Sequence, residues 1–328
     1  MRTRKEGRKD YAKVFKKYRQ TVRQAKGLPD NQGSKDYAFI SEFYFTENPV
    51  NNKWFLDLWA FAENLSQKVG FPIISAGGQY KKKKDSMDET MLGRRYNEKT
   101  KSYLKKIADE GVFSSGGFQG DNRKDLNFCA YMVLASFRYL NVCCRFDRVL
   151  AAGLPKTAVE IAKLSVSLAN IEYGMMHFME HVKTPNDFLG GSSHDRLEQK
   201  ENIDAALWHF HKNKRDILVR NIYLGNLWTR KHVRGDFESS PVMAEVRDVV
   251  PPENIVQLDG DRIFFMLPYD TSIPDRIDHR FEEVRNTLKN NLRKYNVLME
   301  HVYEKEAKEL KGTNWGRHIM PRNGQQGL

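Results

Sequence analysis

The longest weakly charged stretch of the chain, residues 126–144, constrains its fold more than any other feature. Arg138 is the single charged side chain in this stretch, and apolar side chains leave almost no polar face. Such a pattern is typical of a buried helix. After a Gly-Leu-Pro break at residues 153–155, apolar positions recur at helical spacing as far as residue 179. We therefore predict a central helical hairpin over residues 127–182, against which the other segments pack.

The remaining segments fit a mainly α-helical fold with one small β element. Residues 51–69 predict a helix with an aromatic inner face, and residues 276–311 predict a long helix whose apolar spacing suits self-association. Residues 254–266 predict a β-hairpin around an Asp259-Gly260 turn. The short aromatic run 37–45 fits a strand. A chain of 328 residues that is 40% hydrophobic is long enough to build a sizeable core around these elements.

Changes in composition divide the chain into three parts. We predict a basic amphipathic N-terminal arm at residues 1–26, one helical body at residues 36–311 with a sub-boundary near 184–193, and a flexible tail at residues 312–328. The Gly-rich run 114–120 lacks the Gly-Lys-Ser/Thr ending of a phosphate-binding loop, so we interpret it as a turn.

Positive charge is concentrated at the start of the chain. The formal net charge is +12, and residues 1–26 hold eleven lysines and arginines against two acidic residues, a surplus of nine. A surplus of this size attracts polyanions, and nucleic acid is the first partner to consider, with an anionic membrane second. Apolar residues recur along the arm at three- and four-residue spacing. A solubilising terminal helix is the alternative interpretation.

Two further basic patches are interleaved with aromatic residues, a combination that suits phosphate contacts and base stacking. A mobile loop and a solvated helix face are the alternatives for these patches. The candidate nucleic-acid-binding residues are Arg2, Arg4, Lys5, Arg8, Lys9, Lys13, Lys16 and Lys17 in the arm; Lys81, Lys82, Lys83, Lys84, Arg94 and Arg95 in the second patch; and Lys212, Lys214, Arg215, Arg230, Lys231 and Arg234 in the third.

One motif has the spacing of a zinc site. Residues 177–181 read His-Phe-Met-Glu-His, and on a helix this spacing places His177 and His181 on one side with a glutamate beside them. The motif resembles that of the inverzincin metallopeptidases, which implies a third ligand at Glu245 or Glu253. The alternative is a core His177 and a His181 that favours the end of a helix dipole. We predict no metal site, no cofactor and no enzyme activity, with a zinc metallohydrolase kept as an alternative.

The compartment is predicted from the cysteines and from the start of the chain. Cys129, Cys143 and Cys144 all fall in the apolar stretch, where cysteine acts as a small buried apolar residue. The first ten residues are charged, unlike a signal peptide, and Arg138 argues against a membrane span. We expect a soluble intracellular protein without a membrane span.

In size and charge layout the chain resembles the coat or nucleocapsid protein of a small RNA virus. The resemblance implies a virion protein that binds RNA in preference to DNA, packages it, and forms a homo-oligomer through helix contacts that include residues 276–311. Its location would then be the virion and the host cytoplasm. A plasmid or phage DNA-binding factor for replication or partition, located in the cytoplasm, is the alternative within binding proteins.

Overall fold

The fold is that of a computed structural model of the whole chain. It describes residues 37–46, 53–81, 89–110, 112–121, 129–136, 139–168, 170–180, 207, 211–269 and 279–306. Over these residues the protein is a mixed α/β fold, so the prediction of a mainly α-helical fold is wrong. The arm at residues 1–26 and the tail at residues 312–328 lie outside the described residues.

The described residues form strands, α-helices and three 3-10 turns. The strands are β1 (Tyr37–Phe45), β2 (Ile73–Lys81), β3 (Glu89–Arg95), β4 (Val112–Asp121), β5 (Cys129–Ser136), β6 (Tyr139–Arg145), β7 (Ile171–Glu180), β8 (Gly225–Thr229), β9 (Ile255–Gln257) and β10 (Arg262–Met266). The α-helices are α2 (Lys53–Val69), α3 (Glu98–Glu110), α4 (Phe146–Ala151), α5 (Leu154–Leu168), α9 (Arg230–Val233), α10 (Pro241–Val249), α11 (His279–Leu292) and α12 (Met299–Val302). Three 3-10 turns are η1 (Lys212–Lys214), η2 (Pro252–Asn254) and η3 (Arg293–Tyr295).

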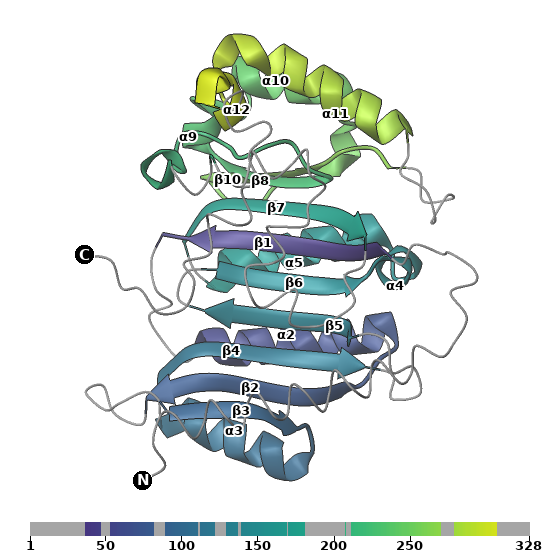
Figure 1. Cartoon of the computed structure of the whole chain (residues 1–328), viewed down its shortest axis with the longest axis vertical. Coiled ribbons are helices and arrows are strands. Elements are labelled where there is room, and N and C mark those ends of the chain that lie inside the picture. Colours follow the sequence, from purple (N-terminus) through teal and green to yellow (C-terminus); the bar gives the residue numbers. More distant parts are fainter. Residues whose placement is uncertain are drawn as a thin grey trace.

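The described strands form one ten-stranded sheet in the order β3-β2-β4-β5-β6-β1-β7-β8-β10-β9, in which all neighbours are antiparallel (Figure 1). One arrangement recurs three times: two strands joined through helices lie on either side of a third strand. It occurs as β6 and β7 around β1, as β3 and β4 around β2, and as β8 and β9 around β10. Each is a split β-α-β unit, and the flanking strands of each unit are parallel to one another.

Helices α2 and α5 cover one face of the sheet, which we call the helix face. On that face a Cβ atom built on Gly116 of β4 would lie 2.5 Å from the Phe55 ring of α2. A Cβ on Gly174 of β7 would lie 2.3 Å from the Phe43 ring of β1, so neighbouring aromatic side chains use the space that glycine leaves. Figure 1 shows α2 and α5 behind the strands. Because side chains alternate along a strand, Glu42, the residue before Phe43, points to the opposite face of the sheet.

The predicted central helical hairpin is wrong in both halves, although its second half does contain a helix. Residues 129–136 and 139–145 are strands β5 and β6 in the interior of the sheet. A strand in the interior of a sheet also has a continuous apolar run, so the absence of a polar face did not distinguish strand from helix. Residues 154–168 are the helix α5, as their spacing predicts, but residues 171–180 are strand β7.

The structure confirms some of the other local predictions and contradicts others. Strand β1, helix α2 and the β9-β10 hairpin are confirmed. The Gly-rich run 114–120 lies inside strand β4, so its interpretation as a turn is wrong. The long helix predicted for residues 276–311 is not continuous, because α11 ends at Leu292 and Asn296 adopts a left-handed conformation with φ 50° before α12 begins. Cys143 and Cys144 are buried.

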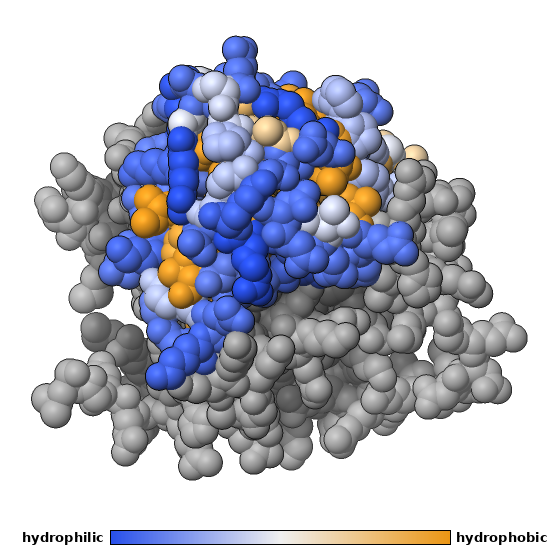
Figure 2. All heavy atoms as spheres, turned by 90° about the horizontal axis from the view of Figure 1, so that it is seen from above, coloured by the Kyte–Doolittle hydropathy of each residue, from blue (hydrophilic) through white to orange (hydrophobic). Residues whose placement is uncertain are grey.

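Helices α9 to α12 gather at one end of the molecule, near β8 and β10 (Figure 1). Figure 2 looks down on this end and shows a surface that is mainly hydrophilic, with smaller apolar patches. None of the helices in the described ranges has the length and apolar character needed to cross a membrane.

Candidate functional site

A row of polar residues crosses the face of the sheet opposite the helix face. By register, Asn141 of β6 lies beside Glu42 of β1, Glu42 beside Met175 of β7, and Met175 beside Asn226 of β8. Asn141, Glu42 and Asn226 are all buried. The Asn226 side chain accepts a hydrogen bond from the Tyr223 backbone N–H and donates one to the Tyr223 carbonyl. Buried polar groups need such partners, and Asn226 has them in the Tyr223 backbone.

Glu42 and Arg220 form the charged centre of this row. The Arg220 side chain is fully buried, and its Nη1 lies 3.9 Å from Glu42 Oε2. The Tyr44 hydroxyl donates a 2.9 Å hydrogen bond to the same carboxylate oxygen. Burial, followed by the nearby Glu42 charge, raises the pKa of Tyr44 well above its usual value. Tyr44 therefore stays protonated and keeps donating to Glu42.

The Tyr223 ring brings a second arginine and a histidine to this centre. The Arg220 and Arg285 guanidinium carbons lie 5.8 Å and 5.9 Å from the ring centroid, within the range of cation–π attraction. Arg285 of α11 also donates a 2.7 Å hydrogen bond from Nε to the Ile222 carbonyl. The His177 ring packs edge-on against Tyr223 at 5.5 Å. We call Glu42, Tyr44, His177, Arg220, Tyr223 and Arg285 the buried polar cluster.

A β-bulge places an additional carboxyl group at the rim of the cluster. Tyr44 pairs with Tyr173 and Phe45 with Ile171, so Glu172 is the extra residue on β7. Burial raises the pKa of Glu172, and the charge of Arg215 opposes that shift. The Arg215 guanidinium lies 5.4 Å from the centre of the Tyr44 ring, and burial lowers its pKa. Shifted pKa values in one cluster mark it as a candidate functional site.

His232 connects this rim to strand β8. The side chain is fully buried, its Nδ1 lies 3.1 Å from the Thr229 backbone nitrogen, and its Nε2 lies 2.8 Å from the Arg215 carbonyl oxygen. A backbone N–H can only donate and a carbonyl can only accept, so the ring is the neutral tautomer with its proton on Nε2. Burial lowers the pKa of His232 to about 4.

The tyrosines of the second basic patch face the interior. Tyr80 is 2% exposed, and its hydroxyl shares a 2.9 Å hydrogen bond with the Tyr103 hydroxyl. The Tyr96 hydroxyl donates to Glu63 and accepts from Trp59 Nε1, both at 2.6 Å. These rings are used in packing α2 and α3 against the sheet rather than displayed as stacking surfaces.

The structure describes only some of the basic residues of the second patch. Lys81 ends β2 and Arg94 lies in β3, while Arg95 ends β3 with an exposed side chain. Lys82, Lys83 and Lys84 lie outside the described residues. The patch is thus near one end of the sheet, where β3 is the terminal strand.

Members of the third patch contact the protein's own oxygen atoms and aromatic rings. Lys231 forms a 3.0 Å ion pair with Asp216, and Arg234 donates a 3.2 Å hydrogen bond to the Asn296 carbonyl. Arg215 covers the Tyr44 ring, as described above. Lys212 and Lys214 belong to η1. Of the aromatic residues near this patch in the sequence, Tyr223 and Trp228 are fully buried, and Trp208 lies outside the described residues.

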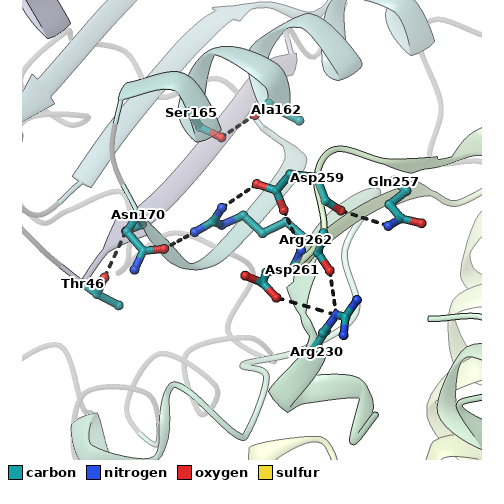
Figure 3. A network of polar contacts seen from close by, with 10 residues as sticks. Thr46, Ala162, Ser165, Asn170, Arg230, Gln257, Asp259, Asp261 and Arg262 are labelled. Carbon is teal, nitrogen blue, oxygen red and sulfur yellow. Dashed lines mark hydrogen bonds and ion pairs between the residues drawn. The ribbon is translucent and has the colours of Figure 1, made fainter. Parts of the chain in front are cut away.

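Arg230, also in the third patch, belongs to a network that fixes the β9-β10 turn (Figure 3). Its Nε donates a 2.6 Å hydrogen bond to the Gly260 carbonyl, and its Nη1 forms a 2.8 Å ion pair with Asp236. In the same network, Arg262 of β10 donates to the Asn170 side chain just before β7. Arg230 thus has a structural role that its sequence context did not predict.

The helix that the zinc motif requires is absent at this position. Residues 177–180 lie in strand β7, and His181 lies outside the described residues. Glu245 forms a 2.6 Å ion pair with Lys294, which is the main reason for its lowered pKa, and Glu253 lies in η2. Within the described ranges, no group of three or more His, Cys, Asp or Glu side chains could hold a metal ion.

Sequence reasoning missed most of the buried polar cluster. It singled out His177, but for a different role, and it did not consider Glu42 or Tyr44 as site residues. A usable signal was present, because Glu42 and Arg220 are each the one charged residue within an apolar run, 37–45 and 217–224. A lone charge in a buried element requires a partner, although the sequence does not say which one.

Comparisons with known proteins do not assign the chain to a family. No protein-family model matches the sequence, and no curated protein matches it. Among solved structures, the Pseudomonas aeruginosa T6SS protein PA0821 is similar over 80% of this chain and 74% of its own, with 9% sequence identity and a TM-score of 0.47. A likeness of this strength carries no inference about function.

Proposed function

We propose that the chain is a nucleic-acid-binding protein and that residues 1–26 make most of the contacts with phosphate. The observation that carries the proposal is the uneven distribution of charge. The described residues contain 28 lysines and arginines and 25 acidic residues, whereas residues 1–26 contain eleven and two. The body is close to neutral, so a polyanion is attracted chiefly to the terminal segment.

The physical mechanism is release of counterions from the nucleic acid. Each phosphate that a lysine or arginine neutralises frees condensed cations, and the affinity then falls steeply with added salt. Several cations of the body already have carboxylate partners, as the Lys231–Asp216 and Arg230–Asp236 pairs illustrate. A phosphate would have to compete with these carboxylates, whereas the terminal segment has few acidic residues of its own.

The more specific role is packaging of RNA by a coat-like assembly. Charge neutralisation by the bound nucleic acid would allow strongly basic copies to approach one another, and α11 would contribute to contacts between copies. Electron microscopy with and without RNA tests this part separately. Shells or filaments support packaging, while discrete monomers or dimers on RNA favour the alternative of a DNA- or RNA-binding replication or partition factor.

A pair of charge-matched variants tests the binding proposal. The arm variant replaces Arg4, Lys5, Arg8, Lys9 and Lys13 with Gln, and the control replaces the exposed lysines Lys99, Lys105, Lys106, Lys156 and Lys163 with Gln. Fluorescence anisotropy with labelled single-stranded RNA at low salt should show an affinity loss of at least about tenfold for the arm variant and a much smaller loss for the control. Equal losses in the two variants would contradict the proposal.

A further inference from the structure

Strands β2 and β4 carry the same pattern of residues on the face of the sheet opposite the helix face. Both read Ser-x-Gly-x-Gln, at residues 75–79 and 115–119. Gly116 faces α2, so the residues that alternate with it face the other way. Antiparallel pairing places each serine opposite the glutamine of the other strand, and glycine opposite glycine. We call this set the polar floor, and its members are Ser75, Gly77, Gln79, Ser115, Gly117 and Gln119.

The floor is partly open to solvent. Gln79 is exposed and the other five residues are half-buried, whereas Ala76 and Phe118, which face the helices, are buried. The helices α9 to α12 gather at the other end of the molecule, away from β2 and β4 (Figure 1). A partner could therefore approach the floor along the face opposite the helix face.

Packing within the sheet and on the helix face accounts for two of the four glycines in these runs. A Cβ atom on Gly116 would meet the Phe55 ring, and one on Gly78 would lie 2.5 Å from the Ser115 carbonyl oxygen. Gly77 and Gly117 face the other way and leave backbone without side chains at the centre of the floor. Glycine inside a strand weakens the strand, and it often marks a place where a ligand approaches the backbone closely.

Strands β3 and β6 add a cation on one side of the floor and an acceptor on the other. Arg95 of β3 pairs with Ser75, and its side chain is exposed. Register through β5 places Asn141 of β6 in the same row as Gly117. The Asn141 side chain is buried, and among the described residues its Oδ1 atom has no hydrogen-bond partner. A buried acceptor without a donor is costly, so a ligand that donates to this atom would be stabilised there.

The charge of these strands suits a phosphate-bearing ligand. The runs 75–79 and 115–119 contain no charged residue, so nothing in them repels an anion. Strands β2 and β3 contain three cations, Lys81, Arg94 and Arg95, against the one acidic residue Glu89. A phosphate beside Arg95 would leave the attached base over the uncharged floor.

The polar groups of the floor match the edges of an unpaired base. A planar base can lie flat over the Gly77–Gly117 pair, with a glutamine amide at each end of the pair. Each glutamine amide both donates and accepts, the combination that pairs with N6 and N7 of adenine. Bases inside a duplex are stacked and paired, so they cannot lie flat on a sheet.

We propose that the polar floor binds the bases of a single-stranded nucleic acid, with Arg95 on a phosphate and Asn141 Oδ1 accepting from a base amino group. The row from β3 to β6 covers four strand spacings, about 19 Å, which suits two or three nucleotides. The inference rests on the proposed function, and it adds contacts to bases to the phosphate contacts of residues 1–26.

A pair of matched double variants tests the floor. The floor variant is Gln79→Ala with Gln119→Ala, and the control, Gln67→Ala with Gln257→Ala, removes two exposed glutamines elsewhere. In fluorescence anisotropy with a short oligoadenylate, the floor variant should lose at least about tenfold in affinity and keep the salt slope of the wild type. Its affinity for a duplex RNA of the same length should not change, and the control should match the wild type throughout. Unchanged oligoadenylate affinity, or an equal loss for the duplex, would overturn the proposal.

A measurement on the wild-type protein decides the matter without a variant. The side-chain amide resonances of Gln79 and Gln119 should shift when adenosine 5′-monophosphate is added. Ribose 5-phosphate, which has the phosphate but no base, should leave them in place. Shifts with both compounds, or with neither, would contradict base binding at the floor.

Failure of the floor and failure of the proposed function give different results. A floor variant that binds oligoadenylate like the wild type, while the variant of residues 4–13 loses affinity, would exclude the floor and leave phosphate binding by residues 1–26 in place. A wild type that binds neither RNA at low salt would overturn both.

Discussion

Two halves of one continuous sheet are stabilised by different interactions. In the half formed by β2, β4 and α2, the Phe55 ring stacks on Phe113 with ring centroids 3.7 Å apart and planes 3° from parallel, and Gly116 leaves the space for Phe55. In the half formed by β1, β7 and β8, the face opposite the helix face holds the buried pair of Glu42 and Arg220. The first half is stabilised by aromatic packing on the helix face, and the second has a buried polar cluster in addition to its apolar residues.

The difference predicts how each half responds to acid. Aromatic stacking has no protonation state, so its contribution to stability does not change with pH. The second half contains His232, a fully buried ring whose pKa burial lowers, so acid forces a charge into this half. Acid should therefore act on one half before the other.

Removal of an aromatic ring from the apolar half should have the largest effect. Phe55→Ala deletes a fully buried ring and leaves a cavity, which should lower the free energy of unfolding by about 4 kcal/mol. Urea unfolding at pH 7 and pH 5 should give the same loss. Leu56→Ala, on the same helix but 39% exposed, is the control and should cost less than about 1 kcal/mol. A pH-dependent loss for Phe55→Ala would remove the distinction between the halves.

Loss of the Glu42 charge should come next. Glu42→Gln keeps the shape but deprives the fully buried Arg220 of a nearby carboxylate, at a cost of about 3 kcal/mol. Adding Arg220→Met removes the buried charge and should recover part of that loss in urea unfolding. If the double variant is as unstable as the sum of the single variants, the two side chains do not act as a pair.

His232 should produce a smaller, pH-dependent effect. Its folded pKa of about 4 lies below the ordinary histidine value of 6.5, so the unfolded chain binds the proton more readily. Stability from the neutral ring is complete above pH 6.5 and is lost as the pH falls toward 4, by about 2 kcal/mol between pH 7.5 and pH 5. In thermal or urea unfolding, the wild type should lose this much stability between the two pH values, and His232→Gln should not. Parallel pH profiles would contradict the assignment.

The exposed ion pair Arg230–Asp236 should have the smallest effect. Both side chains are largely exposed, and Arg230 keeps its hydrogen bond to the Gly260 carbonyl when the carboxylate is lost. Asp236→Asn should change the unfolding free energy by less than about 1 kcal/mol, with the difference vanishing at high salt. A change as large as that of Glu42→Gln would mean that exposure does not explain why the Arg230–Asp236 pair contributes less stability than the Glu42–Arg220 pair.

Local signals predicted the elements that depend on local chemistry. The Asp259-Gly260 turn predicted the β9-β10 hairpin, and the aromatic run 37–45 predicted β1. The register of β1 could not be predicted, because its partners β6 and β7 lie about a hundred residues or more further along the chain. The apolar run 126–144 fitted both a buried helix and interior strands, and periodicity alone does not separate them.

The candidate site was less predictable than the fold. The pairing of Glu42 with Arg220 depends on a strand and a loop that are distant in sequence, and spacing gives no indication of it. The histidine motif at residues 177–181 suggested ligands only because a helix was assumed there. Charge composition, by contrast, is independent of the fold, so the proposal for residues 1–26 remains after the change from a helical to a sheet-based body.

The salt dependence of RNA binding tests the functional account most directly. For single-stranded RNA, each phosphate neutralised contributes about 0.7 to the slope of log affinity against log salt. Replacement of Arg4, Lys5, Arg8, Lys9 and Lys13 with Gln should make this slope shallower by up to about 3.5, while the five-lysine control keeps the wild-type slope. Identical slopes for all three proteins, or no binding by the wild type at low salt, would contradict the account.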